Sequence, residues 1–554
     1  MKDVKDFFNS MHYEVNPKKD AEILGRLISN PQIKKHLVQR TVCIAVALFL
    51  WIYINGGLVP RFMQSKMGML QIGNDADIIA FFPESDDDGA NIKWARGVNS
   101  LEKLERALYS KDVHMVEADI MLRGQGTKTQ ELTPVMAQFP DTDGEVTFDI
   151  WLDAVIKANT KGIKLDFQAM DAVELTLQKL KNRKEELKVP VWIHANVLQG
   201  PWGGVPKVDP IRFVKVIRKM FKECTISLGW TTGHHTDLSQ SGYTWDMVLD
   251  MYHVVYKLEL EPPIVYEARA SFIQNSVPQL KWLVDNTRAS LLVFQDPKDI
   301  EDNYHENLMY VSYKFPPHKA FFDLTSEQLE YYLRENRHRS GQKLDARVEM
   351  RDTLIFRPEA WVKMGFHMEA HSILPSTEAI VLQSRAVYMV TKAKYKPTDN
   401  IKLQGRVQFL NRKNLQPEDG RTGLSIIVRS NSYMDFENIK GIKCFIGLDG
   451  EIVVESSNLP GKGFKESQRM TPGSANCYRF SVVDTGREVL FTVTVLHDCF
   501  TLESVKPSER IAAQMRVAIP AEVGGVAVEH PFIVKLEDSK RTAIIDELTV
   551  KYKT

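Results

Sequence analysis

The chain has 554 residues, which is too many for one compact core and predicts two or more domains joined by connecting segments. Its 71 basic and 71 acidic side chains leave no net charge. The sequence also lacks a long basic stripe and any interleaving of basic with aromatic residues, so a nucleic-acid-binding protein is disfavoured.

One stretch departs from the average composition: residues 41–60 contain no charged side chain. A helix of that length rises about 30 Å, the thickness of the hydrocarbon core of a bilayer. Lys34, Lys35 and Arg40 lie just before it, and the positive-inside rule then keeps residues 1–40 in the cytoplasm. We therefore expect a single-pass membrane protein with a transmembrane signal anchor and with its bulk outside the cell or in a lumen. A cleaved signal peptide and a buried core helix are the alternatives.

Residues 61–90 are expected to form a solvated linker, since they end close to the acidic run ESDDDG. From Asn91 onward, β-rich runs alternate with amphipathic helical patterns. The runs are NIKWAR, MVEADIML, PVMA, GIKLDFQ, VPVWIHANV, CTISLGWTT, PPIVYEARA and ASLLVFQD. Eight such runs predict a parallel (β/α)8 barrel of the TIM type over residues 91–312, and an open doubly wound sheet is the alternative.

A different pattern follows the barrel. Residues 313–368 contain a capped helix from Thr325 and a charged connector. From residue 369 to 554, runs of alternating apolar and polar residues are separated by turn residues, which predicts an antiparallel β-sandwich of jelly-roll shape. Two of Cys444, Cys477 and Cys499 are expected to pair if this domain lies in an oxidising compartment.

Carboxylates gather on two of the predicted barrel strands. Glu117 and Asp119 are two residues apart in VEADI, so both side chains point to one face, which we expect to be the barrel lumen. Lys164 and Asp166 share a face of another strand in the same way. Active sites of such barrels lie at the C-terminal ends of the strands, where three carboxylates can hold one hard divalent cation, Mg²⁺ or Ca²⁺.

Basic residues give these acids an alternative role. Arg96, Lys164 and Arg269 would offset the three carboxylates in a buried ion-pair network that needs no metal. The same three side chains are also candidates for binding an anionic ligand at the barrel mouth.

Further residues are candidates for lining a ligand pocket at this mouth. His194 and Asn196 share one strand face, and Trp230 would form an apolar wall. The alternative for His194 is a hydrogen-bonded core residue, and the alternative for Trp230 is that it closes the top of the core.

Six motifs occur in order between residues 91 and 296: WARGVNS, VEADI, PVMAQFP, KGIKLDFQ, VWIHANVLQGP and SLGWTT. Together they resemble the menorin family. Menorin-like domains are related to the phospholipase C-like phosphodiesterase barrels, which include the glycerophosphodiester phosphodiesterases. The resemblance implies a barrel fold and a membrane-associated or secreted protein that acts in complexes at the cell surface.

The related enzymes cleave phosphodiesters with a divalent cation held by carboxylates and with two histidines as acid and base. The three acids named above match the metal-binding acids by this resemblance. Arg96 and Gln138, however, stand where the enzymes carry the histidines, and Gln168 stands where a lysine is usual. Neither Arg96 nor Gln138 exchanges protons near neutral pH.

The sequence therefore predicts a pseudoenzyme: a membrane-tethered binding or cell-surface patterning protein, with a protein partner at the cell surface and a phosphodiester or other anionic ligand. The alternative is a divalent-metal-dependent, glycerophosphodiester-type phosphodiesterase in which His194 or another group has taken over the proton transfer.

Overall fold

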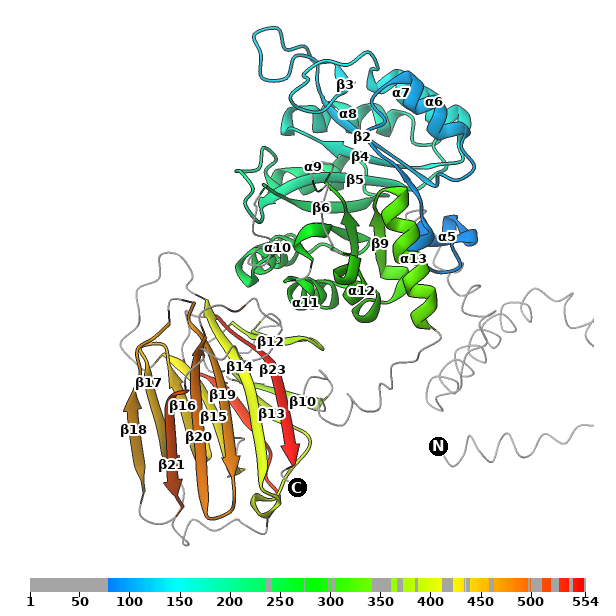
Figure 1. Cartoon of the computed structure of the whole chain (residues 1–554). Coiled ribbons are helices and arrows are strands. Elements are labelled where there is room, and N and C mark those ends of the chain that lie inside the picture. The colour runs from blue at the N-terminus through cyan, green and yellow to red at the C-terminus, as the bar shows by residue number, and fades with distance from the viewer. Residues whose placement is uncertain are drawn as a thin grey trace, which may run out of the picture. The chain divides into compact units, whose positions relative to one another are not determined.

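The computed structural model describes residues 78–234, 242–273, 275–296, 299, 305–340, 360–365, 372–383, 387–410, 422–432, 434, 439–457, 463–473, 475–496, 499, 511–519, 528–537 and 542–552. The expected cytoplasmic segment, the expected span at 41–60 and parts of the linker and the connector lie outside these residues. Within them, no helix combines the length and the apolar composition that crossing a membrane requires. The described residues form a barrel and then a β-sandwich (Figure 1).

A parallel sheet builds the first domain. Within the described residues its eight strands are hydrogen-bonded in the order β1-β2-β4-β5-β6-β7-β8-β9. The two end strands lie close together, since Nε of Arg96, next to β1, is 2.9 Å from Oδ2 of Asp323, the last residue of β9. The sheet is therefore nearly closed, which confirms an eight-stranded parallel barrel. The bounds are β1 Trp94–Ala95, β2 Met115–Leu122, β4 Gly162–Phe167, β5 Val191–Gln199, β6 Thr225–Thr231, β7 Ile264–Arg269, β8 Ser290–Phe294 and β9 Ala320–Asp323.

Two strand predictions are corrected by this sheet. The sequence predicts a parallel barrel strand at PVMA, but β3 (Pro134–Met136) pairs antiparallel with β2. Only residues 123–133 separate β2 from β3, which is too short for the crossover helix that a parallel pair needs. The eighth parallel strand is instead β9, which lies beyond residue 312, so the barrel sheet ends later than the sequence indicated.

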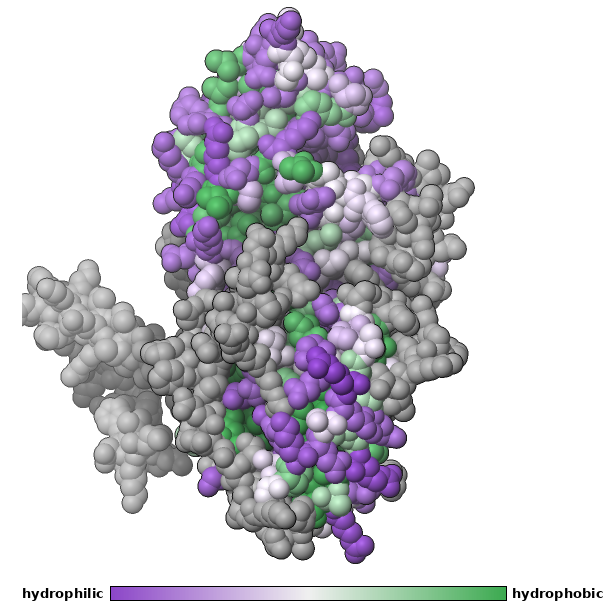
Figure 2. Space-filling view, turned by 90° about the vertical axis from the view of Figure 1, so that its left-hand side faces the viewer, coloured by the Kyte–Doolittle hydropathy of each residue, from purple (hydrophilic) through white to green (hydrophobic). Residues whose placement is uncertain are grey.

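Helices connect most of the barrel strands, and several of them begin at a residue whose side chain caps the helix. The side chain of Ser100 accepts a hydrogen bond from the backbone of α6, and Asp209 and Thr244 do the same for α9 and α10. In the view of Figure 2, hydrophilic side chains are mixed with hydrophobic ones over the described surface. The bounds are α5 Ile78–Phe81, α6 Leu101–Tyr109, α7 Phe148–Ala158, α8 Met170–Asn182, α9 Pro210–Met220, α10 Trp245–Lys257, α11 Val277–Thr287, α12 His305–Lys314 and α13 Ser326–Ser340.

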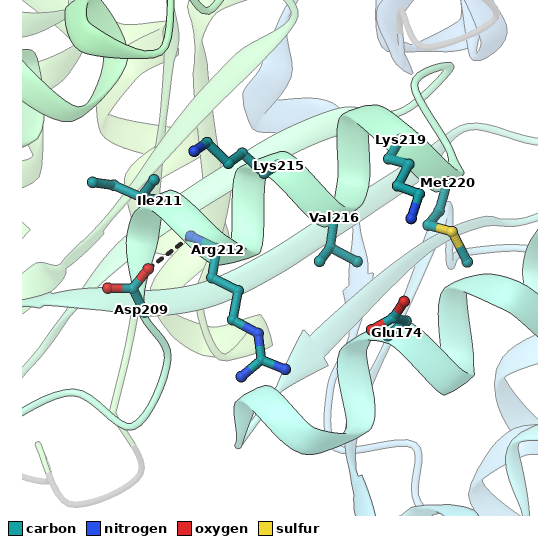
Figure 3. A pocket seen from close by; sticks show the side chains of 8 residues that line it. All are labelled: Glu174, Asp209, Ile211, Arg212, Lys215, Val216, Lys219 and Met220. Atoms are coloured by element: carbon teal, nitrogen blue, oxygen red, sulfur yellow. Dashed lines mark hydrogen bonds between the residues drawn. The ribbon is translucent and has the colours of Figure 1, made fainter.

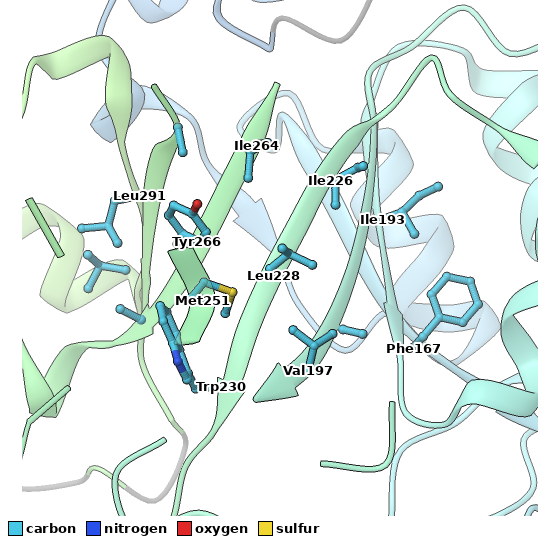
Figure 4. Close-up of a cluster of buried hydrophobic side chains, with 14 of the residues drawn as sticks. Phe167, Ile193, Val197, Ile226, Leu228, Trp230, Met251, Ile264, Tyr266 and Leu291 are labelled. Atoms are coloured by element: carbon cyan, nitrogen blue, oxygen red, sulfur yellow. The ribbon is translucent and has the colours of Figure 1, made fainter. Parts of the chain in front are cut away.

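The main core of the barrel lies between the strands and the helices. Figure 4 shows part of it, where Leu228 of β6 and Tyr266 of β7 lie near Met251 from α10. All three side chains are fully buried. Burying these outward-facing strand residues under amphipathic helices is the packing that makes an α/β barrel stable.

The N-terminal half of the barrel lumen is also apolar. Five strands contribute one buried side chain each to a separate cluster, and the residues before β1 add three more: Met115, Trp192, Val265, Leu292, Phe321, Ile78, Phe82 and Ile92. This apolar floor leaves the C-terminal half of the lumen to the polar side chains that follow on the same strand faces.

Two antiparallel sheets form the second domain. Their orders are β10-β13-β22-β15-β16-β17-β18 and β11-β12-β23-β14-β19-β20-β21. Buried side chains from both sheets, such as Ile426 and Phe480, share one core, which confirms an antiparallel sandwich. Its jelly-roll order stays a prediction. The bounds are β10 Trp361–Gly365, β11 Ile373–Pro375, β12 Ala379–Leu382, β13 Val387–Thr391, β14 Ile401–Leu410, β15 Gly423–Ser432, β16 Lys440–Gly447, β17 Glu451–Ser457, β18 Lys465–Arg469, β19 Cys477–Asp484, β20 Glu488–Leu496, β21 Ile511–Ala518, β22 Ile533–Leu536 and β23 Thr542–Tyr552.

One disulfide closes the sandwich near β19. Cys477, the first residue of β19, is bonded to Cys499, which follows β20. Cys444 is a buried free thiol in β16. The structure thus selects one pair from the three cysteines between which the sequence left the choice open.

Candidate metal and ligand site

Three carboxylates from neighbouring strands meet in the C-terminal half of the barrel. Glu117 and Asp119 come from β2, and Asp119 lies opposite Asp166 of β4 in the strand register. Each residue offers one carboxylate oxygen, and these oxygens lie within 4.8 Å of one another. Two oxygens on opposite sides of a Ca²⁺ ion, each about 2.3–2.6 Å from it, are about 4.6–5.2 Å apart. The cluster is therefore compact enough to share one divalent cation.

Hydrogen bonds orient the two acids of β2. The side chain of Asn99 donates to Oδ2 of Asp119 over 2.9 Å, and that of Gln168 donates to Oδ1 over 2.8 Å. The backbone N–H of Gly97 donates to Oε2 of Glu117 over 2.7 Å. Such contacts fix the direction of carboxylates that serve as metal ligands.

Asp166 differs from the other two acids in its surroundings. Its Oδ1 atom is buried and has no hydrogen-bond partner among the described residues. Burial raises the pKa of Asp166 to about 6, and burial together with the charge of Glu117 raises the pKa of Asp119 well above its usual value. Carboxylate oxygens that are desolvated and poorly partnered fit a hard cation, which would favour their ionised form.

Two basic candidates are paired with acids outside this cluster. Nζ of Lys164 is 2.7 Å from Oε2 of Glu267 in the lumen, and both side chains are almost fully buried. Arg96 pairs with Asp323 and donates from Nη1 to the backbone oxygen of Gln295. The pairs place each basic group against its own acid, so neither neutralises the three carboxylates by direct contact.

Arg269 connects loops at the mouth of the barrel. It forms a two-pronged ion pair with Asp299 and lies 3.4 Å from Asp296, both after β8. Its Nη1 atom also donates to the backbone oxygen of Gly233, which follows β6, over 3.0 Å. The structure therefore does not contain the predicted network of Arg96, Lys164 and Arg269 with the three acids. The guanidinium of Arg269 connects the loops after β6 and β8 and is not free to bind a ligand.

His194 of β5 lies opposite Asp166 of β4 in the strand register, with its side chain buried in the lumen. Its Nδ1 atom is 2.9 Å from Oγ of Ser227 and 3.0 Å from Oε1 of Glu267, and its Nε2 atom is 4.0 Å from Oδ1 of Asp166. Its side chain is only 3% exposed. These contacts make His194 an oriented core residue that supports Asp166, which was the alternative reading of the sequence.

The remaining candidates are spread more widely. Asn196 is half-buried on β5, two residues above His194. Trp230 is fully buried, its ring contacts that of Tyr243 at a tilt, and its Nε1 donates to the backbone oxygen of Met247. It therefore belongs to the core and does not form a ligand wall. Gln138 is exposed beyond β3, and no described residue makes a hydrogen bond to its side chain.

Sequence reasoning missed several residues of this site. Asn99 makes two hydrogen bonds with Asp119, and Ser227 makes one with His194 and donates one to Glu267. Small polar residues of this kind carry no distinctive sequence pattern. Asp323 pairs with Arg96 and is 1% exposed. Its signal was an acid directly after the apolar run AFF, the same arrangement that marks the ends of other barrel strands.

A parallel barrel with a carboxylate cluster at its mouth, followed by an antiparallel sandwich, defines a two-domain class of protein, and comparisons with known sequences agree with both halves. The menorin N-terminal domain matches residues 88–329, and the menorin C-terminal domain matches residues 372–547. The human protein named FAM151B is 37% identical over 243 residues, which cover 44% of this chain and 85% of that protein. This chain belongs to the menorin family.

Solved structures give weaker likenesses. A glycerophosphodiester phosphodiesterase from Parabacteroides distasonis is 14% identical, with 46% of this chain and 99% of that chain covered and a TM-score of 0.29. A winged bean acidic lectin in complex with methyl-α-D-galactose is 8% identical, with 34% and 97% covered and a TM-score of 0.21. Values this low do not bear on what this chain binds or catalyses.

Proposed function

We propose that this chain is a non-catalytic binding protein whose barrel mouth holds one divalent cation, Mg²⁺ or Ca²⁺, and through it an anionic ligand such as a phosphodiester. The observation that supports this most is the meeting of Glu117, Asp119 and Asp166 within 4.8 Å while the nearby basic groups are paired elsewhere. A bound cation would supply the positive charge that a phosphate or carboxylate needs.

The lack of acid–base groups supports the non-catalytic reading. Arg96 is fixed in an ion pair with Asp323, and Gln138 is an exposed amide. Neither side chain takes up and releases protons near neutral pH. Each general acid or base contributes about 10²–10⁴-fold to a rate, so the loss of both removes most of the rate enhancement of a phosphodiesterase.

A phosphodiesterase is the second candidate, because His194 is oriented by Glu267 and faces Asp166. This is the arrangement of a histidine held in one tautomer by a carboxylate. The burial of its side chain, only 3% exposed, opposes the role, since a general acid or base must reach the substrate within hydrogen-bond distance.

The cellular placement is a proposal of its own. We infer a single span at residues 41–60, with residues 1–40 in the cytoplasm and both described domains outside the cell or in a lumen. The disulfide between Cys477 and Cys499 supports it, because structural disulfides form in oxidising compartments. A cell-surface or extracellular protein partner fits this placement.

Cation binding to the purified full-length chain tests the proposed function. Calorimetric titration with Ca²⁺ and with Mg²⁺ should give one site per chain. When the free cation is 100 times the dissociation constant, binding adds about 2.7 kcal/mol to the free energy of unfolding of the barrel. The triple variant Glu117→Gln, Asp119→Asn, Asp166→Asn should lose both effects, because its amides no longer provide charged ligands.

A matched control removes three exposed carboxylates elsewhere on the barrel: Glu105→Gln, Asp141→Asn and Glu185→Gln. It should bind the cation like the wild type; equal binding by the site variant would refute the site. Hydrolysis of a glycerophosphodiester is measured on the same samples. If the wild type hydrolyses it and both Glu117→Ala and His194→Asn abolish this activity, the protein is a phosphodiesterase and the non-catalytic proposal is wrong.

A further inference from the structure

Helix α9 carries a row of cationic side chains on its outer face. Arg212, Lys215 and Lys219 follow one another at three and four residues, and at 100° per residue they fall within an arc of about 60°. Lys222 lies two residues beyond the end of the helix. All four side chains are exposed, and the helical part of the row, from Arg212 to Lys219, is about 10 Å long at 1.5 Å per residue.

An open groove runs along this row, between α9 and α8. Its volume is about 420 Å³. Figure 3 shows Arg212 and Val216 of α9 on the side of the helix that faces Glu174 of α8. Its lining consists of Glu174, Asp209, Ile211, Arg212, Lys215, Val216, Lys219 and Met220.

The four cations of this row differ from those of the neighbouring helix. On and just after α8, Lys179, Arg183 and Lys184 each form an ion pair with an acid, at 2.7, 2.6 and 2.7 Å, and only Lys181 of that group is left without one among the described residues. None of the four cations along α9 forms an ion pair within the part of the chain that the structure describes. In a chain with no net charge, this leaves a local positive potential that an anionic partner would neutralise.

We propose that this face of α9 binds a linear sulphated polysaccharide, a glycosaminoglycan of the heparin class. The row is straight and its charges repeat at nearly regular intervals, so it matches a chain that carries anionic groups along its length. The proposal is independent of the cation site in the barrel.

Two other polyanions fit this face less well. A membrane-binding helix inserts its apolar face into the lipid, but Phe213, Val214 and Ile217 of α9 are fully buried in the barrel core. Single-stranded nucleic acids bind through aromatic side chains on which bases stack, and the groove lining contains none.

Titration of the full-length chain with a heparin octasaccharide tests the proposal. At physiological salt the wild type should bind. A quadruple variant should bind about 10-fold or more weakly: Arg212→Gln, Lys215→Gln, Lys219→Gln, Lys222→Gln. With four cations removed, binding displaces fewer counterions from the polyanion, and their release is what drives the affinity. For the same reason, the logarithm of its affinity should fall less steeply with the logarithm of the salt concentration.

The control replaces four exposed lysines that are dispersed over the barrel: Lys111→Gln, Lys128→Gln, Lys157→Gln and Lys257→Gln. It makes the same change in net charge and should keep the wild-type affinity. If the quadruple variant along α9 does not fold, the double variant Arg212→Gln, Lys219→Gln should still weaken binding several-fold.

Three results would overturn the proposal. The wild type would fail to bind the octasaccharide at physiological salt, or the α9 variant and its control would bind alike. The third is that the wild type binds phosphatidylserine vesicles or single-stranded DNA more tightly than the octasaccharide and that the α9 variant loses this binding. The partner of the face would then be a membrane or a nucleic acid.

Discussion

The ion pair of Lys164 and Glu267 keeps opposite charges inside the barrel lumen. Burial alone would raise the pKa of Glu267, but the charges of His194 and Lys164 lower it below its usual value. Burial alone would likewise lower the pKa of Lys164, but Glu267 and Glu117 raise it. Both groups are therefore ionised throughout the neutral range, and each depends on the other for stability.

This pair predicts how stability changes with pH. Glu267→Gln should lower the free energy of unfolding by about 3–5 kcal/mol near neutral pH, because it leaves the ammonium of Lys164 buried without its carboxylate. A carboxyl whose pKa is lowered by folding stabilises above its unfolded pKa of about 4.3, and this contribution is lost as the pH falls. The deficit of the variant should therefore shrink below about pH 4, as measured by urea unfolding at a series of pH values.

A double variant serves as the control. Lys164→Met combined with Glu267→Gln removes both charges, so it should be more stable near neutral pH than Glu267→Gln alone. A deficit of Glu267→Gln that is equally large at acidic and neutral pH would show that packing, and not charge, explains it.

Single residues of the site could be predicted only where the two-residue period of a strand fixes which face their side chains share. Glu117, Asp119 and Asp166 follow the two-residue period of strands and end on one lumenal face, so the sequence places them together. Asp323 and Asn99 were missed because their roles depend on which strand closes the barrel and on two hydrogen bonds with Asp119. The pairing of Arg269 with Asp299 also depends on loop positions that no local pattern encodes.

Among the elements, β6 packs closely against its neighbours at Gly229. Gly229 lies between Asn196 of β5 and Glu267 of β7 in the sheet register. A Cβ atom at this glycine would be 2.4 Å from Oδ1 of Asn196 and 2.8 Å from Cε1 of His194. The missing side chain thus gives His194 and Asn196 room to point into the lumen.

Gly229→Ala should therefore lower the free energy of unfolding of the barrel by about 1–3 kcal/mol, because overpacking displaces both side chains. Gly204→Ala is the matched control, since a Cβ atom there would meet nothing within 4 Å. That control should change stability by less than about 0.5 kcal/mol in the same urea unfolding experiment. Equal stability of the two variants would mean that β5 and β6 adjust freely around the added methyl group.

The elements were predictable where sequence periods and caps agree. Ser100, Asp209 and Thr244 cap α6, α9 and α10, and a residue of this kind just before an apolar period is a start signal that the sequence shows. The antiparallel pairing of β3 was not predictable from its composition, since PVMA reads like any short barrel strand and only the short connection from β2 excludes a parallel pair. The strand β9 has four residues, too few for a recognisable period.

At the scale of the whole molecule, the pattern of predicted strands and helices along the chain gives the order of the domains. The change from alternating strands and helices to strands alone falls where the barrel ends and the sandwich begins. The pairing of Cys477 with Cys499 could not be predicted from the sequence pattern. It requires the start of β19 and the end of β20 to lie side by side, which is a property of the folded sheet.

The proposed placement across a membrane leads to the last prediction. Residues 41–60 carry no charge, and Lys34, Lys35 and Arg40 precede them, so the N-terminal side should remain in the cytoplasm. If the protein reaches the cell surface, protease added to intact cells should remove the barrel and the sandwich but spare a tag fused before Met1. Permeabilised cells provide the control, because there the tag should be digested as well. A tag cleaved in intact cells would reverse the orientation, and a barrel released into the medium without protease would indicate cleavage after the apolar stretch. The Cys477–Cys499 disulfide offers an independent check: alkylation of cell-surface protein without reduction should leave both thiols unmodified, because they would be oxidised there.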